Sequence, residues 1–256
     1  INSFYPFLCY TKESHHNGDT PVKVAILTAI LGNFDEPFDP VPQRLPEGVT
    51  EVAFHRYTDD DFPPITGLTP RLQYRIPKLF GWQMFPGYDV YIWLDGACTF
   101  KRDDCVEWFL QQLGEKDMVL FRHPNRRSMR QEVKHIEDKL AIDHPYIVPR
   151  YKNGLHKEQL AECMSNPAFE DTVLYASTLF VYRNTPKVQG ALKSWWYHQS
   201  RYYTCDQIAL PYVLWEEGID VHRIDENHYK LGYVSLVSHH RQRHHLKKPT
   251  EPTKVE

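Results

Sequence analysis

The chain has 256 residues, a formal net charge of −3 and 41% hydrophobic residues. Its length is sufficient for a sizeable core, and its nearly balanced charge gives no overall basis for binding nucleic acid or an anionic membrane surface. No apolar run approaches the roughly 20 residues that a membrane-spanning helix needs, so we expect neither a nucleic-acid partner nor a membrane span.

The first predicted strand is Val22–Leu27, and residues 1–20 before it form a lead-in. The strand runs into a loop of small residues, where a ligand can approach the backbone closely. The proline-rich segment Glu36–Pro46 that follows cannot form regular structure. The candidate binding residues of the loop are Thr28, Ala29, Gly32 and Asp35.

The second predicted strand, Glu51–Tyr57, alternates between apolar and polar residues and ends in a run of three aspartates from Asp59 to Asp61. Carboxylates at a strand end are consistent with a solvated turn. They are equally well placed to accept hydrogen bonds from ribose hydroxyls or from a base. Both interpretations stay open, with Asp59 or Asp60 as the candidate contact.

A helix is predicted to begin at Thr69-Pro70, with Thr as the N-cap and Pro at the first helical position. Arg71, Arg75 and Lys78 follow at i, i+4 and i+7 and so share one face. Pro77 must distort or end the helix. A basic stripe is usually a solvated face, but this one directly precedes the next strand, and a diphosphate ligand needs such cations.

The stretch Tyr91–Phe100 contains four apolar or aromatic residues that run into Asp95, after which Gly96 ends the run. Such a continuous run is typical of a strand buried on both faces in a parallel sheet. In open α/β sheets ligands bind beyond the carboxyl ends of the strands. We therefore interpret Asp95, with Gly96 beside it, as the metal and phosphate end of a nucleotide-sugar site.

The next predicted elements are a helix at Asp104–Leu113 and a short strand at Met118–Phe121. Ser128–Gln131 matches a capping box for a helix that carries Glu132 in its first turn. Residues 145–170 are interrupted by prolines and a glycine, which indicates a mixed helical and loop region.

The last third of the chain begins with a predicted strand at Thr172–Tyr182, and a helix starts at Thr185-Pro186. Thr204–Gln207 matches a second capping box, which opens a helix to Trp215, and Ile219–Ile224 is a final strand. Because strands and helices alternate throughout, the sequence predicts one α/β domain with a mainly parallel central sheet flanked by helices.

These ingredients fit transfer of a sugar from a nucleotide diphosphate, because the leaving diphosphate departs more easily when a divalent ion and fixed cations neutralise its charge. Oxygen ligands suit manganese or magnesium. One carboxylate cannot hold the ion alone, so His239 or His240 is predicted to join Asp95 as a metal ligand.

An acceptor hydroxyl needs a general base where the transfer inverts configuration, and Asp or Glu normally supplies it. Asp206 and Glu132 are the candidates. Both also fall in predicted first turns of helices, where the helix dipole favours a carboxylate without any catalytic role.

Several short motifs together resemble the glycosyltransferase-like family, formerly of unknown function, that includes plant mucilage-related and turgor-regulation proteins. The resemblance implies a GT-A-type Rossmann-like fold and nucleotide-sugar chemistry over residues 22–240. The matching pieces are Leu27–Asp35, Tyr57–Asp60, Pro77-Lys78, Phe85–Asp89, Ile92–Gly96, His123–Arg126 with Glu132, and Cys205–Gln207.

The resemblance also supports functions for individual residues: His123, Arg126 and Glu132 line the sugar pocket, Asp206 is either the base or a donor-sugar contact, and Gln207 is a substrate contact. Two positions depart from the family pattern. The usual GT-A metal motif has a second acid where this chain has Ala97, which leaves Asp95 alone, and Cys205 stands where Arg often precedes the Asp-Gln pair. We expect a UDP-sugar donor and a glycan or polysaccharide acceptor.

The catalytic domain is predicted to span residues 21–240, followed by a basic tail at 241–256. The five cysteines are scattered and odd in number and form no CxxC pair, so neither a disulfide framework nor a zinc knuckle is indicated. Together with the lack of a signal sequence, they favour a cytoplasmic location, with the Golgi lumen as the alternative if an anchor has been trimmed.

Three other functions remain open. A sugar-nucleotide nucleotidyltransferase would need a glycine-rich phosphate loop after the first strand, and Ile26–Asp35 contains only Gly32. A hydrolase of a lipid or phosphate ester would use Asp95 without a nucleotide. A glycan-binding domain without catalysis is consistent with the missing second acid.

Overall fold

The computed structural model describes residues 21–32, 37, 39–62 and 67–236. A six-stranded sheet with the order β2-β1-β3-β6-β5-β7 forms its centre, and a small second sheet pairs β4 with β8. The strands are β1 (Val22–Ala29), β2 (Val49–Tyr57), β3 (Val90–Leu94), β4 (Cys98–Phe100), β5 (Met118–Arg122), β6 (Tyr175–Arg183), β7 (Val221–Ile224) and β8 (Val234–Leu236).

The central sheet is mainly parallel. β1 pairs in parallel with β2 and with β3, and β5 pairs in parallel with β7. β6 lies between β3 and β5 and runs antiparallel to both. The carboxyl ends of five strands and the start of β6 therefore share one edge, where a ligand site is expected in such a sheet.

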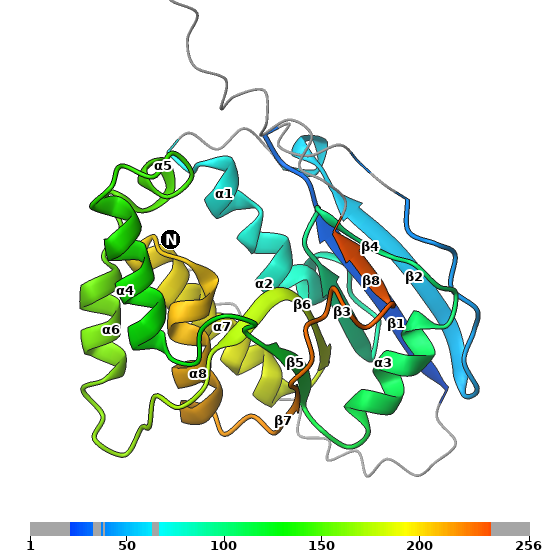
Figure 1. The fold of residues 1–256 in the computed structure, drawn as a ribbon. Coiled ribbons are helices and arrows are strands. Elements are labelled where there is room, and N and C mark those ends of the chain that lie inside the picture. Colours follow the sequence, from blue (N-terminus) through cyan, green and yellow to red (C-terminus); the bar gives the residue numbers. More distant parts are fainter. Residues whose placement is uncertain (1–20, 33–36, 38, 63–66, 237–256) are drawn as a thin grey trace, which may run out of the picture.

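Helices cover both faces of the sheet, with α3 on one face and the α2, α7 and α8 group on the other (Figure 1). Within the described ranges, no helix combines the length and the apolar composition needed to cross a bilayer. The helices are α1 (Pro70–Gln73), α2 (Arg75–Met84), α3 (Cys105–Leu113), α4 (Met129–Leu140), α5 (Val148–Tyr151), α6 (His156–Cys163), α7 (Pro186–Tyr202) and α8 (Asp206–Glu216), with a 3-10 turn, η1, at Asp59–Asp61.

The core divides into two layers because successive residues of a strand point to opposite faces. In β1, Val24 and Ile26 face the layer under α3, whereas Ala25 and Leu27 face α2 and α7. All five residues of β3 are buried. The predicted fold class, an α/β domain with a mainly parallel sheet flanked by helices, is therefore confirmed, as is the expectation of a strand buried on both faces.

The predicted strand that runs into Asp95 and ends at Gly96 is confirmed, and a second short strand follows it within Tyr91–Phe100. β3 ends at Leu94, and β4 then pairs with β8 in the second sheet, with Cys98 opposite Leu236. Asp95 N–H donates to the carbonyl of Thr178 in β6, which extends the pairing by one residue before the chain turns at Gly96. A Cβ at Gly96 would lie 2.8 Å from the carbonyl oxygen of Ala29, so this turn requires glycine.

The helix predicted at Thr69 does begin there, since Thr69 Oγ1 accepts a hydrogen bond from Leu72 N–H. The segment is divided at Tyr74 into α1 and α2. Pro77 accounts for the division, because it has no N–H to donate to the carbonyl of Gln73 one turn earlier. Pro77 consequently lies in the first turn of α2, where that N–H has no helical partner in any case.

The predicted helix starts at Ser128 and Thr185 are confirmed by side-chain caps on Gln131 N–H and Val188 N–H. The capping box predicted at Thr204 is wrong. The N-cap of α8 is Cys205, and the hydroxyl of the fully buried Thr204 donates instead to the side chain of Gln159. Thr204 is therefore bonded to a residue distant in the sequence, and not to a backbone N–H in the first turn of α8 as the motif suggested.

Two helical glycines provide a matched test of this packing. An added methyl group at Gly81 of α2 would meet Leu27 Cδ1 in the core, whereas at Gly190 of α7 it would make only an ordinary contact with Glu217. Gly→Ala in a helix gains up to about 1 kcal/mol of propensity, and overpacking costs about 1–3 kcal/mol. We expect Gly190→Ala to raise the thermal midpoint and Gly81→Ala to lower it in calorimetry; a rise in both variants would contradict the close packing of α2 on β1.

Candidate functional site

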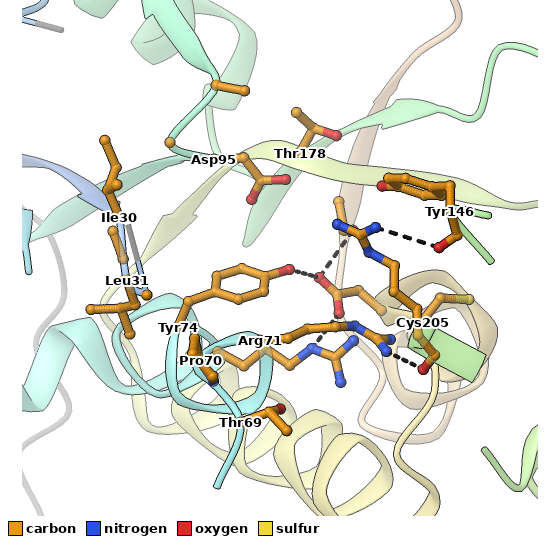
Figure 2. A pocket seen from close by; sticks show the side chains of 18 of the residues that line it. Ile30, Leu31, Thr69, Pro70, Arg71, Tyr74, Asp95, Tyr146, Thr178 and Cys205 are labelled. Atoms are coloured by element: carbon orange, nitrogen blue, oxygen red, sulfur yellow. Dashed lines mark hydrogen bonds and ion pairs between the residues drawn. The ribbon is translucent and has the colours of Figure 1, made fainter. Parts of the chain in front are cut away.

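A cavity of about 640 Å³ opens at the sheet edge where β1 and β3 end and β6 begins. Residues after the two strands form one wall, α1 and the start of α2 form the floor, and the segment around α5 with the turn after α7 forms the opposite wall (Figure 2). Eight of the predicted site residues line it: Ala29, Gly32, Arg71, Arg75, Asp95, Gly96, Asp206 and Gln207.

Asp206, the first residue of α8, is the centre of the polar network beneath the cavity. One carboxylate oxygen lies 2.8 Å from Arg75 Nε. The other accepts from Lys78 Nζ at 2.6 Å and from the hydroxyl of Tyr74 at 3.2 Å. Only 6% of Asp206 is exposed, so its charge is compensated by buried partners and by little solvent.

Lys78 connects the two carboxylates of the site. Its side chain is 1% exposed, and its Nζ also lies 3.2 Å from Asp95 Oδ1, which accepts a second bond from Trp93 Nε1 at 2.7 Å. The Asp95 side chain is 30% exposed and lines the cavity. Lys78 therefore lies beneath the cavity floor, in contact with the carboxylate of Asp95 that lines the cavity.

The two carboxylates have opposite pKa shifts. Burial alone would raise the pKa of Asp206, but Arg75 and then Lys78 outweigh it and hold that pKa well below the ordinary aspartate value of 3.8. Burial raises the pKa of Asp95, and the attraction of Lys78 does not fully offset it. Burial, followed by the charge of Asp206, also raises the pKa of Tyr74 to about 12, so this phenol stays a neutral hydrogen-bond donor.

The basic stripe shares one face as predicted, but that face is mostly buried. Arg71 donates to the carbonyl oxygens of Arg150 and Thr204, and Arg75 donates to Thr204 as well. Arg71 also lies 4.3 Å from the ring centre of Tyr151. The stripe therefore holds the α5 segment and the turn before α8 against α1, while Arg71 and Arg75 still bring positive charge to the cavity.

The first-loop and aspartate-run residues lie near one another at the β1 and β2 ends. Both carboxylate oxygens of Asp59 accept from Gly32 N–H at 3.0 Å, so Asp59 fixes the loop after β1. Asp60 lies in η1 and is exposed, and Thr28 is buried in β1; neither lines the cavity. Asp35 lies outside the described residues.

His123, Arg126 and Glu132 form a cluster of their own and, contrary to expectation, do not line the cavity. Arg126 is ion-paired with Glu132, and Glu132 Oε1 lies 3.8 Å from Sγ of the cavity-lining residue Cys205. These residues follow β5, which β6 separates from β3. Burial, with a further contribution from Arg126, lowers the pKa of His123 to about 4, so its imidazole is neutral.

The prediction missed all five tyrosines of the cavity, which share no motif. Tyr74 and Tyr229 lie near the carboxylates, and three more line the wall opposite the β1 end: Tyr146, Tyr151 and Tyr203. Ser177 and Thr178 of β6 also line the cavity, and Ser177 Oγ lies 3.5 Å from Asp206. Ser177 and Thr178 could have been identified from the sequence, because they form a polar pair inside an otherwise apolar strand.

Asp95 could hold a divalent ion as a single carboxylate ligand that is completed by the phosphates of a bound substrate. The described part of the chain contains no group of three or more His, Cys, Asp or Glu side chains that could hold a metal. Magnesium-like ions are often held by one or two carboxylates together with substrate phosphates, and Asp95 projects into the cavity as such a carboxylate. The predicted ligands His239 and His240 lie outside the described residues.

A family model described as TOD1/MUCI70, glycosyltransferase-like domain, matches residues 68–227, which include most of the cavity-lining residues. No curated protein matches the sequence.

Solved structures with a similar arrangement have low identity to this chain. A glycosyltransferase involved in glycosylation of the PBCV-1 major capsid has 8% identity and a TM-score of 0.41 and covers 87% of this chain and 97% of its own. Mouse xyloside xylosyltransferase 1 has 13% identity, a TM-score of 0.37 and coverages of 70% and 64%. The Saccharomyces cerevisiae mannosyltransferase Ktr4p has 11% identity, a TM-score of 0.36 and coverages of 86% and 73%.

The opposite pKa shifts predict opposite effects of two conservative substitutions. Asp206→Asn leaves Arg75 and Lys78 undercompensated and is expected to cost about 3–5 kcal/mol at neutral pH. Because the native pKa of Asp206 is lowered, its contribution is present above pH 3.8 and is lost as pH falls toward the lowered value. The difference in unfolding free energy between the wild type and Asp206→Asn should therefore become smaller below pH 3.8.

Asp95→Asn should instead raise the thermal midpoint at pH 7. The native pKa of Asp95 is raised, so its ionisation costs stability as pH rises through that value, and the cost is absent below pH 3.8. Thermal unfolding of both variants between pH 3 and 8 checks this. A lower midpoint for Asp95→Asn at pH 7 would show that Asp95 is not held at an electrostatic cost.

Proposed function

The chain belongs to the TOD1/MUCI70 glycosyltransferase-like family, and we propose that its cavity binds a nucleotide-diphosphate sugar and transfers the sugar to a hydroxyl group of a glycan. The donor class we propose is a UDP-sugar. The support is the family together with the chemistry of the cavity, in which cations and one accessible carboxylate meet at the carboxyl ends of the strands.

The observation that carries the proposal is the position of Asp95. It follows the fully buried strand β3, lines a cavity large enough for a small-molecule ligand, and is backed by the buried ammonium of Lys78. A carboxylate with a raised pKa in such a place is retained at a cost in stability. Strain or electrostatic cost at a cavity is typical of a functional group.

We place the diphosphate between Asp95 and the guanidinium groups of Arg71 and Arg75, which supply fixed positive charge as the diphosphate leaves. Gly32 and Gly96 let the turns after β1 and β3 pack closely, because a Cβ at Gly32 would meet Pro70 and one at Gly96 would meet Ile30 and the carbonyl oxygen of Ala29. A divalent ion held by Asp95 and the phosphates, manganese or magnesium, would add Lewis-acid stabilisation of the leaving diphosphate.

Asp206 is better suited to positioning than to proton abstraction. A general base is most effective when its pKa lies near the working pH, whereas Asp206 is buried, ionised and bonded to Arg75, Lys78 and Tyr74. Gln207 follows it, lines the cavity, and its carboxamide has no hydrogen bond to the described residues. We assign Gln207 to the donor sugar. Glu132, the other candidate base, is buried, ion-paired with Arg126 and absent from the cavity lining, so the geometry does not favour it as the base either.

A nucleotide-binding experiment tests the proposal. We expect UDP to bind in isothermal titration calorimetry, more tightly with manganese than with EDTA, and a screen of nucleotide sugars to give a product of one added sugar by mass. Asp95→Ala should abolish transfer while the protein stays folded, because the loss is of a ligand contact and not of core packing.

Asp138→Ala is the matched control, since Asp138 is an exposed carboxylate of α4 whose ion pair with Lys134 contributes little. It should transfer at the wild-type rate. Full transfer by Asp95→Ala would remove Asp95 from the mechanism. Absence of binding by UDP and by the other nucleoside diphosphates would refute the donor assignment and favour a hydrolase or a glycan-binding domain.

A further inference from the structure

The cavity wall opposite the β1 end has a composition unlike the rest of the site. Its side chains are the tyrosines Tyr146, Tyr151 and Tyr203, with Arg150 and Pro149. The guanidinium of Arg150 lies 3.7 Å from the ring centre of Tyr146, and Tyr146 is 41% exposed. An exposed aromatic ring held in place at a cavity rim is a surface that a ligand can cover.

Tyr203 has an unfavourable backbone conformation at this wall. It follows α7 with φ +53° and ψ +48°, in the left-handed region that a bulky L-residue rarely adopts. A helix end of this type normally has Gly or Asn at that position. The hydroxyl group of Tyr203 is fixed 3.0 Å from Thr69 Oγ1, and its side chain lines the cavity. Retention of strain beside a cavity indicates that this side chain has a function there.

The aromatic wall and the donor side lie on opposite sides of the carboxylates. In Figure 2, Tyr146 and Cys205 lie across the cavity from Ile30 and Leu31, and Asp95 lies between them. A donor whose diphosphate is at Asp95 and whose nucleoside extends toward the β1 end would leave the aromatic wall free. That wall then faces the reacting carbon from the other side.

We propose that the aromatic wall is the acceptor subsite and that its ligand is a carbohydrate chain, with Tyr146 and Tyr203 in contact with sugar rings. The proposal rests on the proposed function for the placing of the donor. Its own evidence is the strained Tyr203, the exposed Tyr146 and the arrangement of the two walls.

The chemistry of the wall favours a carbohydrate over other acceptors. A sugar ring combines an apolar C–H face, which an aromatic ring can cover, with a rim of hydroxyl groups that hydrogen-bond to polar side chains. A lipid would need a groove of aliphatic side chains, and Pro149 is the one saturated apolar side chain among the described residues of this wall. A peptide that binds by adding a strand would need an open strand edge, and this wall consists of helices and turns.

The proposal is tested by comparing the steady-state kinetics of Tyr203→Asn with those of the wild type, using the donor identified in the nucleotide-sugar screen. Asn tolerates the left-handed conformation, so the thermal midpoint should not fall. The KM for the acceptor should rise by about tenfold, the loss of one aromatic contact, while the KM for the donor does not change. Tyr203→Phe keeps the ring and should restore the acceptor KM.

A direct binding measurement covers the case in which no donor is found. Saturation-transfer NMR in the presence of UDP, with cellohexaose, xylohexaose and mannohexaose as probes, should detect at least one of them, and the signal should be lost in Tyr146→Ala and Tyr203→Asn. Tyr197→Ala is the matched control, because Tyr197 is 45% exposed on α7 and does not line the cavity.

The outcomes separate this proposal from the proposed function. Glycan binding that depends on Tyr203, without any nucleotide binding, would refute the transferase and leave the carbohydrate subsite in place. Nucleotide binding with no signal from any of the three glycans would overturn the subsite. A rise in donor KM in Tyr203→Asn, or a lower thermal midpoint with an unchanged acceptor KM, would also overturn it.

Discussion

The buried carboxylate of Asp206 is the constraint on which the site depends. Two cations reach it from α2, and the same cations connect it to Asp95 and to the carbonyl of Thr204. Replacing one partner of a buried pair leaves the other uncompensated, whereas removing the whole network need not destabilise the fold. A network of this kind fixes the relative positions of α2, α8 and the β3 end, and so it specifies the shape of the cavity floor.

The fold could be predicted from the sequence wherever a local pattern decided the structure. The apolar run before Asp95, the caps at Thr69 and Thr185 and the effect of Pro77 each follow from contacts within a few residues. The capping box at Thr204 failed because Gln159, 45 residues away, took the hydroxyl group. The strand order, with β6 inserted between β3 and β5, is likewise decided by long-range packing that no local pattern records.

The candidate site shows the same division. Charged residues that follow a strand or share a helical face could be predicted from the sequence pattern. Asp95 and Arg75 line the cavity, and Lys78 lies beneath it in contact with Asp95. The tyrosine wall could not be found in this way, because Tyr146 and Tyr203 come from separate loops that meet only in the folded chain. His123 was predicted at the site because it follows a strand. That strand is β5, which β6 separates from β3, so His123 does not line the cavity.

The two sides of the cavity are positioned by different physical means, and this bears on how the site could change. The carboxylate side is fixed by the buried charges of Asp206, Arg75 and Lys78, among which a single substitution leaves an uncompensated ion and is costly. The aromatic side is fixed by short segments, α5 and the turn at Tyr203, which Arg71 holds through the carbonyl oxygens of Arg150 and Thr204. Replacing one aromatic ring of this wall should change the free energy of ligand binding by only about 1 kcal/mol. Sequence variation within the family should therefore be tolerated at the aromatic wall, where a change alters which ligand is covered, far more readily than at Asp206 or Lys78.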